Sequence, residues 1–517
     1  MKTFVRLLTL LLACLMLAMT VVACDDDTTE DGQGSAMEED AYGRERDDLD
    51  QYNLNYMGDE VSVLYWSDVE NPEFDVEQIT SDNVNNALYD RNGEIERRLN
   101  VELKFSGVPG NVNNRKGFVS VVDTDYKSQS HAYDLIASYS RTEGMLAIQG
   151  FLADLKSIEG SMINEDKPWW PDTLLETVTI GDKMFFLSGD ISPNVLHLMQ
   201  VIYFNKDLLN EYWNTYAQEQ GFESDRDENG KEIVSPAARM IYDWAYKGTW
   251  TIDKLITLTT AEGIAKDNGT ATGVQDIEDQ YGFTSIPYCI DCFYTGSNLR
   301  LVEETDDGGV LKISDDYGSA KTVKLVNKMS TWFSNPACWT LYDFSYITLF
   351  QNGNAMFAGL RAHHVKHFDE DWDYGVMPVP KYDEKQLNYY TCMGNPFTLY
   401  GIYDGLDTHG DKPARLAEMT AVIECWASES YRLVTPEVFE VNMQLKYADT
   451  QYETDMFEIV RSSVVFDLGR IFANDLSFMS ELPSRAAVYH ASWSSTYGSY
   501  KKSLNAKLEE IVSQLKV

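Results

Sequence analysis

The sequence predicts an α/β protein in which buried strands of parallel sheets alternate with helices. Residues 60–66 are apolar nearly throughout, as in a strand buried on both faces of a parallel sheet. An amphipathic helical pattern follows, and residues 101–105 then alternate as a second strand. Strand, helix and strand in this order form one βαβ unit. Trp66 ends the first strand, at the sheet edge where open α/β sheets place their ligands.

Residues 349–380 show the same organisation farther along the chain. A helix ends there at an Asn-Gly pair, because glycine accepts the left-handed conformation that closes a helix. Residues 355–358 are a short apolar run between glycines, which indicates another strand buried on both faces. Gly359 ends that run, where a missing side chain permits a turn or a close ligand. A second strand, at 372–376, leads into a Pro-Val-Pro exit.

The order of these motifs resembles the extracellular solute-binding proteins (family 1) of bacterial ABC importers, in the lipoprotein form that captures sugars and oligosaccharides. Further segments carry the resemblance: Asp-Leu-Ile at 134–136, Gly-Phe-Leu-Ala-Asp-Leu at 150–155, Val-Ile-Tyr-Phe-Asn at 201–205 and Gly-Thr-Trp-Thr at 248–251. Together they cover residues 58–517. The resemblance implies a periplasmic-binding-protein-like fold of type II, with two α/β lobes, a hinge and a central ligand cleft.

The resemblance also implies a division of the chain. The expected parts are a lipoprotein signal peptide at 1–23, an acidic disordered tether at 24–57, the first part of lobe 1 at 58–182, the first part of lobe 2 at 183–392, a return to lobe 1 at 393–464 and C-terminal helices on lobe 2 at 465–517. The tether is expected because this acidic, glycine-bearing stretch has hardly an apolar residue to bury.

Composition restricts the partners. The 517 residues suffice for two or three ordinary domains, and an apolar content of 44% is that of a globular protein. The 82 acidic residues outnumber the 42 basic ones and give a formal charge of −40. This charge argues against nucleic acid as a partner, because phosphates would be repelled. Aromatic residues make up 12% of the chain, which suits sugar binding and also the filling of cores.

The first residues predict export and a lipid anchor. Lys2 and Arg6 precede an apolar stretch, 7–22, that is shorter than a comfortable membrane span. It ends in Val-Val-Ala-Cys, which looks like a bacterial lipobox. In such lipoproteins Cys24 becomes the first mature residue and carries acyl chains such as palmitate. The alternative is an ordinary signal peptide or short anchor.

The other cysteines and the histidines show no complete metal-site pattern. Cys289 and Cys292 have C-x-x-C spacing without a second pair, and residues 293–296 indicate strand or loop. We interpret the pair as structural thiols or one local disulfide. His363, His364 and His367 are interpreted as a solvated loop, with metal binding as the alternative.

An acidic turn is a weak candidate for calcium. Asp225, Asp227 and Asn229 fit the first half of an EF-hand loop, D-x-D-x-N-G. Pro236 stands where the bidentate glutamate belongs, so the loop is incomplete. The plain acidic turn is the alternative, and no other cofactor is expected.

The expected function is therefore capture of a carbohydrate, without chemistry of its own, and delivery to the permease subunits of an ABC importer. The protein would be a lipid-anchored monomer on the outer face of the membrane. Alternatives are a surface glycoside hydrolase, which needs two carboxylates across a cleft, and the same fold binding a peptide or other solute. The predicted ligand-binding residues are Trp66, Tyr139, Arg141, Asp190, Asn205, Trp250, Tyr288, Gly359, Arg361 and Asn395.

Overall fold

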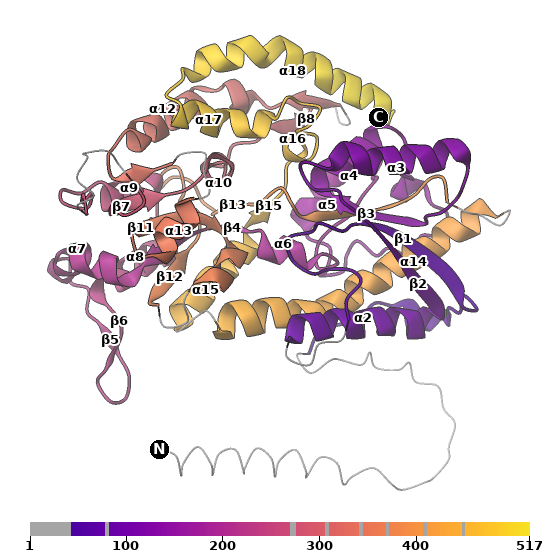
Figure 1. The fold of residues 1–517 in the computed structure, drawn as a ribbon, viewed down its shortest axis with the longest axis horizontal. Coiled ribbons are helices and arrows are strands. Elements are labelled where there is room, and N and C mark those ends of the chain that lie inside the picture. The colour runs from indigo at the N-terminus through magenta and orange to yellow at the C-terminus, as the bar shows by residue number, and fades with distance from the viewer. Residues whose placement is uncertain are drawn as a thin grey trace, which may run out of the picture. The chain divides into compact units, whose positions relative to one another are not determined.

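The protein was analysed as a computed structural model, which describes residues 43–77, 82–268, 276–305, 310–340, 345–368, 372–406, 411–446 and 450–516. The expected signal peptide and Cys24 lie outside these residues. Two central sheets, each with helices around it, make up the described part (Figure 1). None of its helices is both long and apolar enough to cross a membrane.

The first sheet has four strands in the order β14-β3-β1-β2. Its members are β1 (Asp59–Trp66), β2 (Val101–Val108), β3 (Leu135–Tyr139) and β14 (Thr398–Ile402). β1 pairs in parallel with β2 and with β3, as the βαβ pattern predicts, whereas β14 joins β3 antiparallel from far along the chain. β3 and β14 are buried along their whole length. Because both faces are covered, neither strand shows an alternating pattern.

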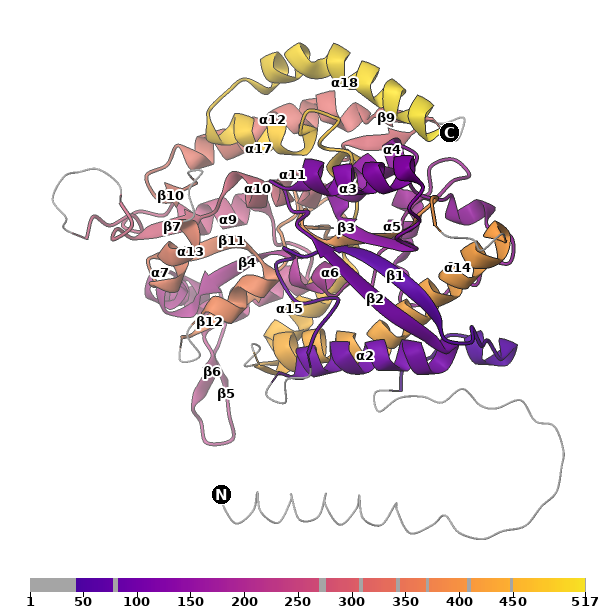
Figure 2. The same cartoon turned by 45° about the vertical axis from the view of Figure 1, so that its right-hand side comes forward.

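Helices cover both faces of this sheet. The helices α2 and α14 lie on one face and α3 and α4 on the other in both views (Figures 1 and 2). Their bounds are α2 (Asn83–Leu99), α3 (Arg115–Ser128), α4 (Ser140–Ile148) and α14 (Lys412–Glu429). Asp82 begins α2 by accepting a hydrogen bond from the backbone nitrogen of Asn85, and Asn100 ends it in the left-handed conformation.

The second sheet is mixed and has five strands in the order β10-β7-β11-β4-β12. Its members are β4 (Gln200–Asn205), β7 (Tyr281–Thr284), β10 (Cys338–Trp339), β11 (Ala355–Arg361) and β12 (Tyr374–Met377). β11 lies at the centre, fully buried, parallel to β7 and antiparallel to β4. The apolar run at 355–358 is thus part of a strand that continues to Arg361, and Gly359 lies inside it rather than at its end.

Six helices surround the second sheet. They are α7 (Lys206–Glu219), α8 (Pro236–Tyr246), α9 (Ile252–Thr259), α12 (Ala320–Phe333), α13 (Ser345–Gln351) and α15 (Gln451–Ser462). The last of these packs against β12 and α8. The sequence predicted that residues 393–464 return to lobe 1. The helix α15 lies in this range, yet it packs against the second sheet. Its Glu453 contributes to this packing by accepting a hydrogen bond from Tyr242 of α8.

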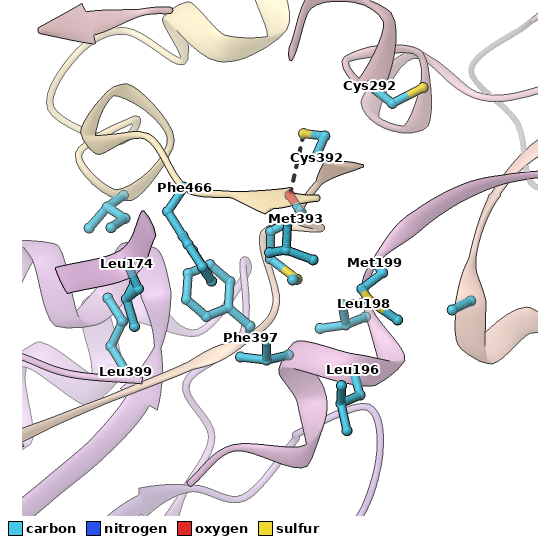
Figure 3. Close-up of a cluster of buried hydrophobic side chains, with 14 of the residues drawn as sticks. Leu174, Leu196, Leu198, Met199, Cys292, Cys392, Met393, Phe397, Leu399 and Phe466 are labelled. Atoms are coloured by element: carbon cyan, nitrogen blue, oxygen red, sulfur yellow. Dashed lines mark hydrogen bonds between the residues drawn. The ribbon is translucent and has the colours of Figure 1, made fainter. Parts of the chain in front are cut away.

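Short pairings carry the main chain between the two sheets. Leu187 bridges Tyr400 at the edge of the first sheet, and Met199 bridges Met393 beside the second. β13 (Thr391–Cys392) and β15 (Val464–Val465) form a small parallel pair between them. Apolar side chains fill this crossing region, and Figure 3 shows Leu198, Met199, Met393 and Phe397 gathered there. The crossing is therefore a compact apolar joint and not a long linker.

The C-terminal segments form a layer over both sheets. α16 (Leu468–Ile471), α17 (Leu482–Val488) and α18 (Trp493–Leu515) belong to it, with the 3-10 turn η7 (Met479–Glu481). α17 and α18 pack with α12, whereas α16 packs against α4 of the first sheet. Both views place α12, α17 and α18 together at one end (Figures 1 and 2).

Residues 43–57 correct the expected extent of the acidic tether. Leu49 is buried, and the short 3-10 helix η1 (Leu49–Tyr52) holds it. Asp47 accepts two hydrogen bonds from the Arg98 guanidinium at 2.6 Å, and Arg46 pairs with the buried Glu429 at 3.1 Å. This stretch is ordered because its charges find partners on α2 and α14, which composition could not show.

The C-x-x-C pair lies on helices rather than on a strand or loop. Cys289 belongs to α10 (Pro287–Ile290) and Cys292 to α11 (Cys292–Gly296). The described cysteines are free and buried, so the local disulfide is not formed. Burial raises the pKa of the Cys289 thiol to about 12, which keeps it protonated and unreactive.

The remaining elements are short connections. They are η2 (Leu155–Ser157), α5 (Asp172–Val178), α6 (Pro193–His197), β5 (Asp225–Arg226), β6 (Glu232–Val234), β8 (Val302–Glu304), β9 (Leu311–Ile313), η3 (Asp315–Gly318), η4 (Ala362–His367), η5 (Ser430–Val434) and η6 (Pro436–Lys446).

Candidate ligand-binding site

Two predicted aromatic residues end neighbouring strands of the first sheet. Trp66 ends β1 and Tyr139 ends β3, and their ring centroids lie 5.6 Å apart. Trp66 donates from Nε1 to the hydroxyl of Thr398 on β14 at 3.0 Å. Both are almost fully buried, at 0% and 2% exposure. The sequence predicted that both residues end strands at the same sheet edge, and this is confirmed. Their two buried rings pack against each other there.

The loop after β1 reaches from the first sheet to the second. Its Glu70 carboxylate accepts hydrogen bonds from Nη1 of Arg361, at the end of β11, at 2.8 and 3.1 Å. Asn71, the next residue, donates to Asn194 Oδ1 at 2.8 Å and accepts from Lys366 Nζ at 2.9 Å. The carboxyl edge of β1 therefore faces the end of β11, and polar groups of both sheets meet between them.

Arg361 and Tyr288 form the second-sheet side of this interface. The guanidinium carbon of Arg361 lies 5.1 Å from the Tyr288 ring centroid. The Tyr288 hydroxyl is 2.8 Å from that of Tyr346, and burial raises the pKa of Tyr288 well above its usual range. Gly359 precedes Arg361 on β11, and a Cβ there would lie 3.0 Å from Ser285 Oγ. Glycine therefore permits close packing of the segment after β7 against β11, and ligand contact by Gly359 stays a prediction.

Asn395 lies beside Arg361 on the segment that crosses between the sheets. A Cβ on the preceding Gly394 would lie 3.0 Å from Nε of Arg361, so the two segments are in close contact. The backbone oxygen of Asn395 accepts a hydrogen bond from Ser140 Oγ at 2.6 Å. Its side-chain oxygen is buried and has no donor among the described residues. Tyr139, Asn395, Arg361 and Tyr288 thus form one continuous neighbourhood.

Arg141 lies in the first turn of α4 and faces the C-terminal layer. Its Nη2 donates to Glu481 Oε1 at 3.0 Å, and its guanidinium carbon is 5.4 Å from the Phe478 ring centroid. Arg115, the first residue of α3, lies 5.7 Å from the same ring. Sequence reasoning missed both Arg115 and Phe478. The start of α3 after the second strand was a usable signal for the arginine, whereas nothing local distinguishes Phe478.

A buried ion pair between Arg470 and Asp291 lies near Arg141. Arg470 Nη1 is 3.4 Å from Asp291 Oδ2, and Ser484 donates to the other carboxylate oxygen of Asp291. Burial raises the pKa of Asp291 to about 7, against the lowering effect of Arg470, while Glu481 raises it further. This carboxyl group is therefore partly protonated near neutral pH.

Three predicted residues, whose part in ligand binding stays a prediction, make other contacts in the structure. Asn205 caps α7 by accepting from the backbone nitrogen of Leu208 at 3.0 Å. Trp250 donates from Nε1 to the Pro378 oxygen at 2.9 Å and is fully buried among aromatic rings. Asp190 accepts from the Thr435 hydroxyl at 2.5 Å and lines a separate cavity of about 410 Å³. Asn205 ends β4, Trp250 lies between α8 and α9, and Asp190 follows the Leu187 bridge to the first sheet.

The histidine segment is not the solvated loop that the sequence indicated. His363 and His364 lie on the 3-10 helix η4 and are buried, at 6% and 7% exposure, whereas His367 is exposed. Burial lowers the pKa of His363 and of His364 well below the usual value. In the part of the chain that the structure describes, no group of three His, Cys, Asp or Glu residues is arranged to hold a metal ion.

The acidic turn is the end of a β-hairpin formed by β5 and β6. Asp225 accepts from Arg239 at 2.9 Å and from the Tyr452 hydroxyl at 2.6 Å, which occupies one of its oxygens. Asp227 accepts from the backbone nitrogens of Asn229 and Lys231. Two carboxylates that protein groups already engage make a poor calcium loop.

Comparison with known proteins shows the fold. No family model matches this chain, and no curated protein sequence matches it. The galacto-N-biose/lacto-N-biose I-binding protein of an ABC transporter from Bifidobacterium longum, in complex with lacto-N-biose, is similar in structure (TM-score 0.52, 11% identity), covering 89% of this chain and 98% of that one. The cyclic α-maltosyl-1,6-maltose binding protein from Arthrobacter globiformis is also similar (0.51, 13%), covering 87% and 99%.

A third similar structure is the GacH receptor of Streptomyces glaucescens, which was determined unliganded and with acarbose (TM-score 0.50, 13% identity, 87% of this chain and 99% of that one). All three are binding proteins. At such identities the likeness extends to the fold alone, which is that of the two-lobed solute-binding proteins.

Proposed function

We propose that this protein is the extracellular substrate-binding component of an ABC importer and that it captures a carbohydrate, in particular an oligosaccharide. The observation that carries the proposal is the interface where β1 and β3 end opposite the end of β11. Two sheets meet at this interface. The main chain crosses between them in the segments 187–199 and 391–400, which isolated β-bridges hold together. Such an arrangement permits hinge closure around a ligand.

The side chains of the interface suit a sugar. Carboxylates, guanidinium groups and amides can each bond sugar hydroxyls, as Glu70, Arg361 and Asn395 are placed to do. The rings of Tyr288 and Phe478 can stack on the apolar faces of pyranose rings. The three similar proteins are named for a cyclic maltosyl-maltose, for lacto-N-biose or for binding acarbose, and this supports carbohydrate as the ligand class.

The lobes follow the two sheets. We assign the first sheet with α2, α3, α4 and α14 to lobe 1, and the second sheet with α7, α8, α9, α12, α13 and α15 to lobe 2. The closed form would dock, as a monomer, on the permease subunits. Capture and release need no reaction, so the protein acts without catalysis and without a cofactor.

The membrane anchor is a separate proposal that rests on the lipobox sequence ending at Cys24. Acyl chains on that thiol would hold the protein on the outer face of the membrane. Replacing Cys24→Ser should release processed protein from the membrane fraction. Retention of the processed variant in the membrane would contradict lipidation at this residue.

Calorimetric titration tests the function. The intact protein, solubilised in mild detergent, is titrated with neutral and acidic oligosaccharides of graded length, with and without calcium. Saturable binding without turnover supports the proposal. Heat that continues after saturation, together with released reducing sugar, would instead identify a glycoside hydrolase. Peptide binding without sugar binding would show that the fold serves another solute.

A further inference from the structure

Four arginines lie around the interface between the two sheets and the adjoining C-terminal layer, in a chain with a formal charge of −40. They are Arg115, Arg141, Arg361 and Arg470. Each has at least one buried guanidinium nitrogen with no hydrogen-bond acceptor among the described residues. Buried polar groups are normally satisfied, and a charged donor without an acceptor is especially unfavourable. Arg91, Arg98 and Arg432 elsewhere in the described residues each have one such nitrogen, whereas Arg115 and Arg470 have two each.

Arg115 has the fewest partners of the four. Its Nη2 donates to Asn474 Oδ1 at 3.3 Å, while Nε and Nη1 are buried without acceptors, and it makes no ion pair with any described residue. Burial lowers its pKa and the neighbouring charge of Arg141 also lowers it, whereas Tyr139, Glu481 and Asp475 raise it, and the guanidinium remains charged. A half-buried cation with a single hydrogen-bond partner among the described residues favours an anion from outside the chain.

Arg141 lies beside the same Phe478 ring as Arg115. Arg141 is only 2% exposed, and its Nε also lacks an acceptor, although Nη2 is paired with Glu481. The guanidinium carbons of Arg115 and Arg141 lie 5.7 Å and 5.4 Å from the Phe478 centroid, so both cations lie close to one ring. An aromatic ring beside two arginines can stack on a sugar through a free face while the guanidinium groups hold the sugar's substituent.

The backbone reinforces this arrangement. α3 starts at Arg115 and α4 at Ser140, and neither has a side chain that caps its first turn. Both positive helix ends therefore lie at the carboxyl edge of the first sheet, where they favour negative charge. Ser477 and Phe478 both adopt positive φ, 56° and 54°. Two successive non-glycine residues in this region are strained, as is common at ligand-binding sites.

Resting on the proposed function, we propose that the captured oligosaccharide is anionic and carries a carboxylate, as in a uronic acid, or a sulfate ester. Arg115 and Arg141 hold the anionic group, and Phe478 stacks on the ring that bears it. Planar guanidinium groups match both oxyanions through paired hydrogen bonds. Glu481, which pairs with Arg141, then accepts from a neighbouring hydroxyl of the same sugar.

The first experiment offers the intact protein a choice. The detergent-solubilised, immobilised protein is incubated with an equal mixture of oligosaccharide digests from neutral glucans and galactans, from polyuronates and from sulfated galactans. Bound sugars are eluted and identified by mass spectrometry, which distinguishes a uronate from a sulfate ester. Preferential recovery of either acidic class supports the inference. Recovery of neutral sugars alone overturns it and leaves the proposed function standing, and recovery of no sugar overturns both.

Substitutions then test the residues. Against the acidic sugar recovered, Arg115→Gln should weaken binding about 10- to 100-fold, because a charge-assisted contact is lost. Arg115→Lys keeps the charge and should lose less. Lys328→Gln is the control, since it removes a cation that lies beside the Tyr382 ring, on α12. Circular dichroism verifies folding, and binding by Arg115→Gln as tight as by the unchanged protein would contradict the assignment.

Discussion

Glu424 illustrates how burial changes the chemistry of a single residue. It lies inside α14 at 1% exposure, where one carboxyl oxygen accepts from Trp170 Nε1 at 3.0 Å and from the Asn164 backbone at 3.2 Å. The other oxygen has no donor among the described residues. Burial raises the pKa of Glu424 from 4.5 to about 7, so the folded protein retains a proton that the unfolded chain releases.

This residue predicts a pH dependence of stability. Its contribution to the free energy of unfolding is fully present below about pH 4.5 and is lost as the pH rises through about 7, on the order of 3 kcal/mol in all. Glu424→Gln cannot ionise, so the Tm of the variant relative to the unchanged protein should rise between pH 5 and pH 8. Glu60→Gln, on the exposed start of β1, is the control. A difference in Tm that does not vary with pH would refute this.

At the scale of elements, Gly189 decides how the chain enters the crossing region. Its φ is 134°, and a Cβ there would lie 2.2 Å from the backbone oxygen of Trp169. The residue precedes α6, whose neighbours Leu198 and Met199 pack in the apolar joint shown in Figure 3. Because backbone and not a flexible side chain stands in the way, a larger residue must separate the two segments.

Gly189→Ala should therefore lower the free energy of unfolding by about 3 kcal/mol or more, measured by denaturant unfolding. Gly221→Ala is the matched control. It also has positive φ, 88°, but a Cβ there meets nothing within 4 Å, so only the backbone strain of about 1 kcal/mol applies. Equal losses in the two variants would mean that the contact with Trp169 relaxes without effect.

At the scale of the whole molecule, the Glu70–Arg361 pair joins the two sheets and should favour the closed form. The Glu70 side chain is 37% exposed, so the pair contributes modestly, roughly 0.5–1 kcal/mol. Glu70→Gln should shift the unliganded population toward the open form about two- to fivefold. Small-angle scattering would show this as a larger radius of gyration, which saturating ligand should reverse.

Glu94→Gln is the control for that measurement. Glu94 is 35% exposed and pairs with Arg97 inside α2, so its loss leaves the two sheets joined as before. A radius of gyration that is unchanged in Glu70→Gln, or changed equally in both variants, would show that the pair does not stabilise closure.

The sequence alone determined the α/β class and most strand positions, because buried apolar runs between glycines and helix caps are local signals. It predicted strands at 60–66 and 133–138, and the structure has β1 at Asp59–Trp66 and β3 at Leu135–Tyr139. It predicted Tyr288, Arg361 and Asn395 for a ligand cleft, which stays a prediction, and the structure brings these residues close together. Resemblance in motif order was enough to predict the fold.

Only the tertiary structure decided which side chains face the interface. Trp66 and Trp250 are both fully buried, yet Trp66 ends β1 and bonds Thr398 of β14, whereas Trp250, between α8 and α9, fills the core of the second sheet. Phe478 reaches Arg115 and Arg141 from hundreds of residues away, through a strained turn that carries no local signature. Local pattern fixes the elements, but the direction of a side chain depends on how distant elements pack, and that information is not contained in any short stretch of sequence.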